Sequence, residues 1–137
     1  MIGKRCAEFL TVALLGGFVY GLVEILFRGY THPSMVAAGG ICFTVLYYIN
    51  LKMKSRNLIL RGLIGSLVIT LVELAFGVVF NMILGMRVWD YSNMPFNFLG
   101  QICPVFSFIW FIFSLPLVYI SVFIFHRLNK RLFLFQE

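Results

Sequence analysis

Four long runs of apolar residues constrain this chain more than any other feature. They cover residues 7–27, 34–51, 61–86 and 98–125. A hydrocarbon core about 30 Å thick requires about 20 apolar residues in helical form, and lipid offers no partners for unpaired backbone groups. The runs therefore predict an all-α, single-domain bundle of four transmembrane helices, with an outer loop over residues 87–97.

The composition supports the same class of protein. Hydrophobic residues make up 61% of the 137 residues and charged residues 12%, against about 45–50% and about 25% in soluble proteins. A soluble domain of this size exposes too much surface to hide so much apolar material. We therefore expect a multi-pass protein of the cell membrane, surrounded by the lipid bilayer.

The basic residues predict which way the helices run. They gather near the N-terminus, between the second and third runs (where Arg61 is counted) and near the C-terminus, and only Arg28 and Arg87 lie on the opposite side. Lys and Arg collect in cytoplasmic loops, so both termini are predicted to be cytoplasmic. Cations placed in this way meet anionic headgroups, so we do not expect nucleic acid to be the partner of the net charge of +6.

The three cysteines do not follow a metal-binding spacing. They are Cys6, Cys42 and Cys103. No metal or cofactor is therefore expected. A disulfide between Cys42 and Cys103, which lie at similar predicted depths in the two halves, is left open.

A short string of residues occurs in both the first and the third run. Residues 22–27 read Leu-Val-Glu-Ile-Leu-Phe and residues 71–76 read Leu-Val-Glu-Leu-Ala-Phe, which aligns Glu24 with Glu73. A duplicated helical hairpin would relate the two halves by an axis along the membrane normal. Chance similarity among apolar residues is the alternative, and the matching glutamate favours duplication.

Two acids lie where lipid disfavours them. Glu24 and Arg28 are spaced for an ion pair between residues i and i+4, on one helix face with Gly17 and Gly21. A charge at the bilayer centre costs about 2.5–3.5 kcal/mol on insertion scales, so we interpret Glu73, in the middle of its run, as a functional residue. Two facing carboxyl groups can relay protons or bind a cation. The alternative is that both glutamates only fix the register of a packed bundle.

Small residues mark the faces at which helices are expected to approach closely. On the third run they form a stripe with one glutamate: Gly62, Ser66, Glu73 and Gly77. On the fourth they are spaced by heptads: Gly100, Ser107, Ser114 and Ser121. Two prolines, Pro104 and Pro116, are expected to kink this fourth helix.

The predicted outer loop combines charged, aromatic and amide groups. It contains Arg87, Trp89, Asp90, Tyr91 and Asn97. One interpretation is an interfacial turn, with Trp89 and Tyr91 in an aromatic belt that also includes Tyr30, and with Asn97 capping the fourth helix. In the same way Thr31 or His32 would cap the second helix. The other interpretation is a lid, or half of an outer ligand site, with Arg28, Arg87 and Asp90 as its charged groups.

At these residues the sequence resembles the family known as Putative ABC-transporter type IV, a set of bacterial integral membrane proteins. The resemblance rests on the glutamate-bearing first helix with Arg28-Gly29-Tyr30-Thr31-His32, on Glu73, and above all on Trp89-Asp90-Tyr91-Ser92 with Pro95, Asn97, Gly100, Ile102 and Trp110. It spans most of the chain and implies a role in transport. Because the chain has no Gly-x-x-x-x-Gly-Lys-Ser/Thr loop, any ATPase would be a separate polypeptide.

Three functions are compatible with these features. The first is a transport component for an ion or small solute, acting as a homo-oligomer, with Glu24 and Glu73 binding a cation or proton and the outer loop acting as a gate. The second is an accessory subunit that binds another membrane protein through the stripes of small residues.

The third is an enzyme acting on a lipid-linked substrate near the outer face. Glu24, Asp90 or His32 would be its acid or base. Arg28 and Arg87 would clamp a phosphate. No zinc-protease motif and no nucleophile–base pair supports this alternative, so the transport hypothesis is preferred.

Overall fold

The computed structural model describes residues 2–134, and the side chains of residues 2–130. Its regular structure is helical: α1 (Ile2–Arg28), α2 (Pro33–Lys52), α3 (Leu58–Phe76), the π-helical segment η1 (Gly77–Ile83) and α4 (Pro104–Leu134). Because η1 continues α3, four helical segments are long and apolar enough to cross a membrane. The predicted class of fold is confirmed, and the chain is a multi-pass membrane protein.

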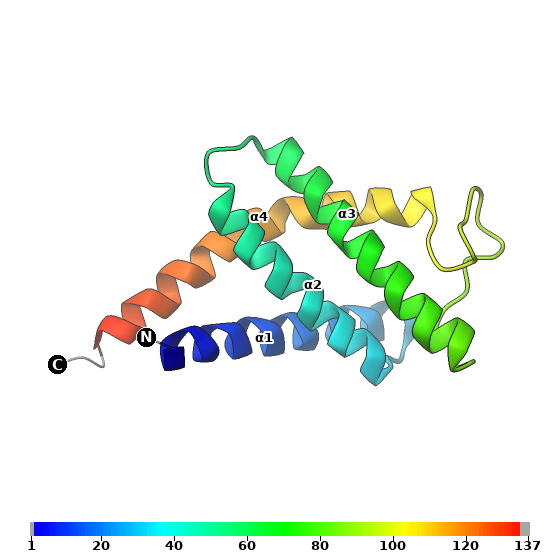
Figure 1. Cartoon of the computed structure of the whole chain (residues 1–137), viewed down its shortest axis with the longest axis horizontal. Helices are drawn as coiled ribbons and strands as arrows, with labels where there is room; N and C mark the ends of the chain where they lie inside the picture. The colour runs from blue at the N-terminus through cyan, green and yellow to red at the C-terminus, as the bar shows by residue number, and fades with distance from the viewer. Residues whose placement is uncertain (1, 135–137) are drawn as a thin grey trace.

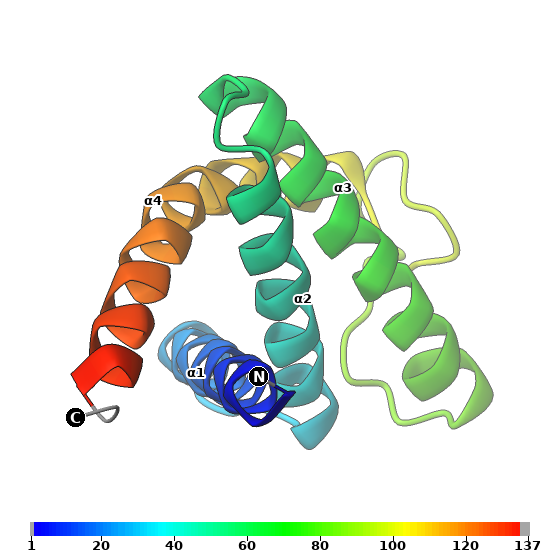
Figure 2. The ribbon, with the colours of Figure 1, turned by 60° about the vertical axis from the view of Figure 1, so that its left-hand side comes forward.

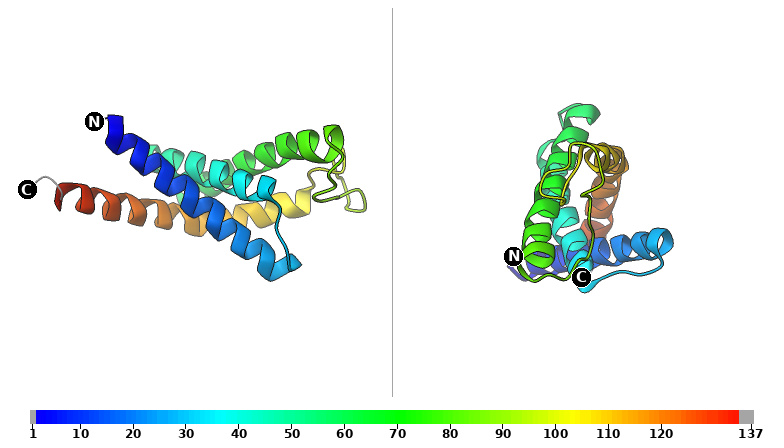
Figure 3. Two further views of the ribbon diagram at one scale, coloured as in Figure 1. Left: turned by 90° about the horizontal axis from the view of Figure 1, so that it is seen from below. Right: turned by 90° about the vertical axis from the view of Figure 1, so that its right-hand side faces the viewer.

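The two ends of this bundle differ in what they contain. The start of α1 and the last turns of α4 lie toward one end, and the connection between η1 and α4 lies at the opposite end (Figure 1 and Figure 3, left). We call the first the inner end and the second the outer end. The prediction that the inner end is cytoplasmic rests on the basic residues and stays a prediction.

Helices α1 and α2 pack backbone to backbone through glycines. A Cβ added to Gly17 would lie 2.8 Å from the carbonyl oxygen of Val36, and one added to Gly40 would lie 2.8 Å from that of Ala13. Small residues permit this close approach between transmembrane helices. The close contact expected at Gly17 is therefore confirmed, and the helix that makes it is α2 of the same chain.

Helices α3 and α4 pack in the same manner. A Cβ on Gly62 would lie 2.6 Å from the Leu115 side chain, and one on Gly65 would lie 2.5 Å from the Ser114 hydroxyl oxygen. The small-residue stripes on these two helices therefore face each other. Helix α2 contacts the other three helices and lies between α1 and α3 in Figure 2.

The largest error in the predicted boundaries concerns α4, which begins at Pro104 and not near residue 98. Leu99 and Gly100 have φ angles of 55° and 68°, which a right-handed helix cannot contain. Gly100 is therefore a loop residue and not part of the serine stripe. Proline suits the first turn of a helix, so the kink expected at Pro104 is wrong, whereas Pro116 lies inside α4, which is bent in Figure 2.

Smaller corrections concern the other helix ends. α1 begins at Ile2, before the predicted residue 7. α3 begins at Leu58, before the predicted residue 61, because the Asn57 side chain caps it by accepting a hydrogen bond from the Leu60 N–H at 2.8 Å. The helical backbone ends at Ile83, so the outer loop covers residues 84–103 and not only 87–97.

Two side-chain expectations are also corrected. Arg61 is buried within the first turn of α3, and so does not belong to the loop with which it was counted. Cys42 and Cys103 are both free thiols, so the disulfide left open by the sequence is absent from the described structure.

Candidate functional site

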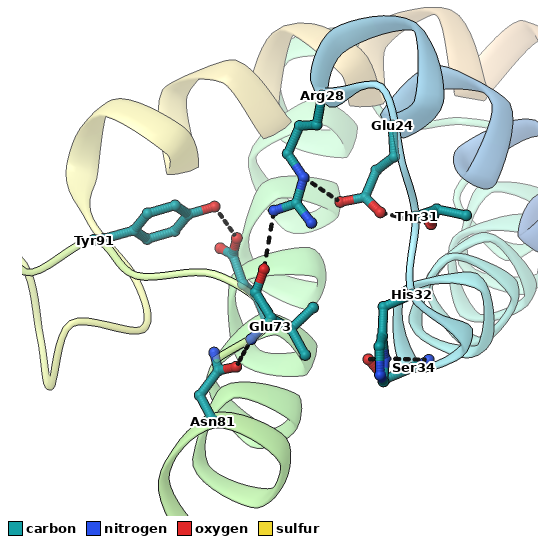
Figure 4. A network of polar contacts seen from close by, with 9 residues as sticks. Glu24, Arg28, Thr31, His32, Ser34, Glu73, Asn81 and Tyr91 are labelled. Carbon is teal, nitrogen blue, oxygen red and sulfur yellow. Dashed lines mark hydrogen bonds and ion pairs between the residues drawn. The ribbon is translucent and has the colours of Figure 1, made fainter. Parts of the chain in front are cut away.

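An ion pair on α1 forms one half of a buried polar centre near the outer end. Glu24 is 7% exposed, and its Oε1 lies 3.6 Å from the Arg28 Nε. The Thr31 hydroxyl donates to the other Glu24 oxygen at 2.7 Å. The predicted i, i+4 pair is therefore present, and the α1–α2 connection supplies a further donor (Figure 4).

Glu73 of α3 forms the other half of this centre. It is 7% exposed, and its carboxyl group accepts hydrogen bonds from the Tyr91 hydroxyl at 2.7 Å and from the Trp110 indole N–H at 3.1 Å. The Tyr91 ring stacks on Phe106 with their centroids 4.4 Å apart. Within residues 2–130, no Lys, Arg or His lies within 4 Å of this carboxyl group. Two neutral donors therefore hold a buried acid.

Arg28 links α1 to the outer loop. One guanidinium nitrogen, Nη1, donates to the Val88 carbonyl at 3.1 Å, and the group lies over the Tyr30 ring, 4.7 Å from its centroid. Its Nε and Nη2 are buried without a hydrogen-bond partner. Glu24, Arg28 and Glu73, together with these donors and acceptors, are called the outer polar centre below. The two carboxyl groups have separate partners and do not bond to each other.

The outer loop is folded into the bundle and does not lie flat at its surface. The Val88 N–H donates to the Asn81 side chain at 2.6 Å, and Asn81 donates to the Gln101 side chain at 2.8 Å. Trp89 is 7% exposed and donates its indole N–H to the Gln101 carbonyl at 3.0 Å. Trp89 was predicted to belong to an outer aromatic belt, but its side chain is buried and its indole finds its partner inside the protein.

Asp90 and Arg87 do not join the outer polar centre. Both are exposed. Asp90 accepts hydrogen bonds from the backbone N–H of Ser92, at 2.9 Å, and from its hydroxyl group. These bonds to the carboxylate lower the pKa of Asp90. Arg87 has a φ of 51°, and its side chain stays at the surface.

Two further predicted residues have structural roles at turns. Asn97 donates to the Met94 carbonyl at 3.0 Å and accepts from the Gly100 N–H at 3.0 Å, so it shapes the outer loop and does not cap α4. His32 caps α2, because its Nδ1 accepts from the Ser34 N–H at 3.2 Å. The prediction that Thr31 or His32 caps this helix is confirmed for His32.

The sequence did not reveal that several residues form a polar cluster at the inner end. The Tyr47 hydroxyl donates to Glu8 of α1 at 2.5 Å. Arg61 donates to both oxygens of Asn50, which in turn reaches the Ser121 hydroxyl at 3.5 Å. The sequence feature that could have indicated this cluster is the presence of polar residues inside apolar runs. Glu8, for example, lies within the predicted first span.

The fold and this centre define a class: a four-span membrane protein in which buried carboxyl groups lie beneath a structured outer loop. A family model described as Putative ABC-transporter type IV matches residues 18–135, and the chain belongs to this family. The match includes every residue of the outer polar centre and leaves out Glu8. The searches of curated proteins and of solved structures returned no match.

Proposed function

We propose that this protein is a small membrane transport component and that its outer polar centre binds a proton or a monovalent cation at Glu73. The observation that carries the proposal is the carboxyl group of Glu73, which is buried at membrane depth with two neutral donors and no cationic partner in the described part of the chain. An acid kept in such a place is costly. A bound proton or cation would remove that cost.

The balance of charges favours a single positive charge. Glu24 and Glu73 carry two negative charges when ionised, and Arg28 carries one positive charge. An uncompensated buried charge is unfavourable by several kcal/mol, so the centre is one positive charge short of neutrality. Arg28 lies with Glu24, which makes Glu73 the acid that takes up the proton or cation.

The outer loop would control access to this acid. Tyr91, one of the two donors to Glu73, is a residue of the loop, and burial is the main cause that raises the pKa of Tyr91. Its hydroxyl group therefore stays protonated and able to donate. A cation that reaches Glu73 from the outer side must displace this hydroxyl, so movement of the loop would accompany binding and release.

Transport would require a further polypeptide or a second copy of the chain. Four helices packed around their own small residues leave little room for a pathway, so we propose that the pathway forms in a homo-oligomer or with a separate membrane partner. The alternative of an accessory subunit that binds through glycine and serine stripes is not favoured, because the stripes of α3 and α4 are used against each other.

Carbodiimide labelling tests the proposal without an ATPase or a known substrate. Dicyclohexylcarbodiimide reacts with protonated carboxyl groups in apolar surroundings, and peptide mass spectrometry locates the adduct. We expect labelling at Glu73, absent in Glu73→Gln, and decreased either by raising the pH alone or by adding Na⁺ or K⁺ at constant pH. Protection by pH alone would assign a proton, and protection by one cation would assign that cation.

A flux assay in proteoliposomes extends the test to transport. We expect Glu73→Gln to lower dye-reported proton or cation flux at least about tenfold, equivalent to about 1.4 kcal/mol, while melting temperature and oligomeric state stay unchanged. Thr11→Val, at an exposed position on α1, is the matched control. If Glu73 does not react with the carbodiimide and is not needed for flux, the proposal is wrong.

A further inference from the structure

Arg61 differs from the other basic residues of the inner end. It is 8% exposed, whereas the others whose side chains are described are all exposed: Lys4, Arg5, Lys52, Lys54, Arg56, Arg127 and Lys130. Exposed cations at a membrane surface are solvated by water and headgroups. A buried guanidinium group requires a specific structural explanation.

Part of the explanation is that Arg61 binds the end of α2. Its Nη2 donates to the Asn50 carbonyl at 2.8 Å and its Nε donates to the Asn50 side-chain oxygen at 3.4 Å. Because Asn50 also reaches Ser121 at 3.5 Å, these contacts join α2, α3 and α4. They fix the position of the guanidinium group, but neutral oxygens do not cancel its charge.

The charge of Arg61 has no carboxylate partner in the described part of the chain, where the one ion pair is Arg28–Glu24. Residues 50–72 contain neither Asp nor Glu. The carboxyl group of Glu8, the acid of this end, accepts a hydrogen bond from Tyr47. The first turn of α3 also carries the positive end of its helix dipole. Among the described residues, Arg61 is therefore a buried cation without an anionic partner.

The remaining guanidinium nitrogen of Arg61, Nη1, is not completely buried. Among the described residues Nη1 has no hydrogen-bond partner, and it is not one of the buried unpartnered nitrogens, which belong to Arg28. Lys54 is an exposed cation in the turn between α2 and α3, and its Nζ is 4.9 Å from the Phe125 ring centroid. Lys54 follows Asn50 by four residues, just beyond the end of α2, and Phe125 follows Ser121 by four residues on α4.

We propose that Arg61 Nη1 and Lys54 bind the phosphate group of an anionic lipid at the inner end. Guanidinium groups bind phosphate oxygens with charge-assisted hydrogen bonds, and Asn50 holds this one in position. With the orientation predicted from the basic residues, the site lies at the headgroups of the inner leaflet, at an end rich in cations. It does not depend on the proposed transport function.

Retention of lipid by the purified full chain tests this site. The protein is exchanged through vesicles of phosphatidylglycerol or of phosphatidylcholine, and bound lipid is counted by native mass spectrometry. We expect Arg61→Gln to lower the affinity for phosphatidylglycerol about tenfold and Lys54→Gln about threefold, as one charge-assisted hydrogen bond predicts. Arg127→Gln, which removes the same charge from an exposed residue of α4, should change it less than about twofold.

Further variants and a second ligand distinguish specific binding from binding by net charge. Arg61→Lys retains the charge without the planar fork and should lie between the wild type and Arg61→Gln, and Lys54→Gln alters an exposed residue, where substitutions usually change stability little. Equal losses in Arg61→Gln and Arg127→Gln would overturn the proposal, because binding would then depend on net charge alone. Arg61-dependent binding of inorganic phosphate without retention of lipid would assign the site to free phosphate and overturn the lipid assignment.

Discussion

The outer and inner ends of this bundle differ in the sign of the buried group that lacks a partner of opposite charge among the described residues. The outer end contains two buried carboxyl groups and one guanidinium group, which pairs with Glu24 alone, and the donors to Glu73 come from a loop and from α4. At the inner end a buried arginine faces the oxygens of Asn50 and no acid in the described residues. One end therefore favours a positive ligand and the other a negative one.

The two ends also differ in how their polar groups are held. In the inner cluster, Asn50 and Arg61 lie near the end of α2 and the start of α3, which a connection of five residues joins. The outer centre depends on a long loop in which three non-glycine residues have positive φ: Arg87, Phe96 and Leu99. It also adjoins η1, and π-helical turns are frequent at functional sites. Strained backbone and π-helical segments persist where function maintains them, so we expect the outer end to move and the inner end to stay fixed.

Removing the indole that anchors the loop should have the largest effect on this contrast. Trp89→Ala deletes a side chain that is 7% exposed together with its hydrogen bond to Gln101. We expect a loss of about 3–5 kcal/mol in the free energy of opening residues 84–103, measured by hydrogen exchange. The amides of α2 near Asn50 should keep their protection.

The matched control is Phe96→Ala in the same loop. Phe96 is 90% exposed, so its removal should change the opening free energy by less than about 0.5 kcal/mol. Equal loss of protection at both ends of the bundle in Trp89→Ala would show that the ends unfold together, and the contrast between them would then be wrong.

The hydroxyl of Tyr91 should have the next largest effect. Tyr91→Phe keeps the ring stacked on Phe106 and removes the donor to Glu73. At the raised pH at which labelling is lost and Glu73 is ionised, a hydrogen bond to its charge contributes about 1.5–3 kcal/mol, so loop protection should fall by an amount in this range. Carbodiimide labelling of Glu73 should become faster, because the hydroxyl that covers the carboxyl group is gone. Unchanged labelling would mean that Tyr91 does not control access.

Much of this arrangement could be predicted from the sequence, for a physical reason. Lipid forces each apolar run into a helix, and a lone acid such as Glu73 stands out in such a run. The ion pair of Glu24 and Arg28 follows from helical spacing alone. These features depend on local rules, so the sequence alone was sufficient to predict them.

The contacts that depend on the folded loop could not be predicted in the same way. Nothing local places Tyr91 beside Glu73, because that contact requires the path of residues 84–103. Trp89 was assigned to the interface because aromatics usually lie there, and its buried acceptor on Gln101 comes from a turn that the sequence does not reveal. Arg61 was counted with the neighbouring loop because of its charge, and its burial depends on an acceptor, Asn50, that lies on another helix.

A smaller effect is expected at the inner end. Asn50→Ala removes the side-chain oxygen that accepts from Arg61 at 3.4 Å, but leaves the backbone carbonyl, which accepts at 2.8 Å. We expect the free energy of unfolding to fall by about 1 kcal/mol, measured by thermal melting in nanodiscs. Asn129→Ala, which removes a bond to the Phe125 carbonyl within α4, should change it by less than about 0.5 kcal/mol. A larger loss in Asn129→Ala would contradict the role given to Asn50.

The smallest effect is expected from the pH dependence of the loop at Asp90. The hydrogen bonds from Ser92 lower the pKa of Asp90 in the folded protein, so the ionised form favours the folded loop. This contribution is complete above the unfolded pKa of about 3.9 and disappears as the pH falls through the lower folded value. Because Asp90 is fully exposed, the change should be slight. In Asp90→Asn, exchange of the Ser92 amide should therefore differ from the wild type above about pH 5 and converge with it in strong acid, whereas a difference that grows in acid would reverse the assigned direction of the pKa shift.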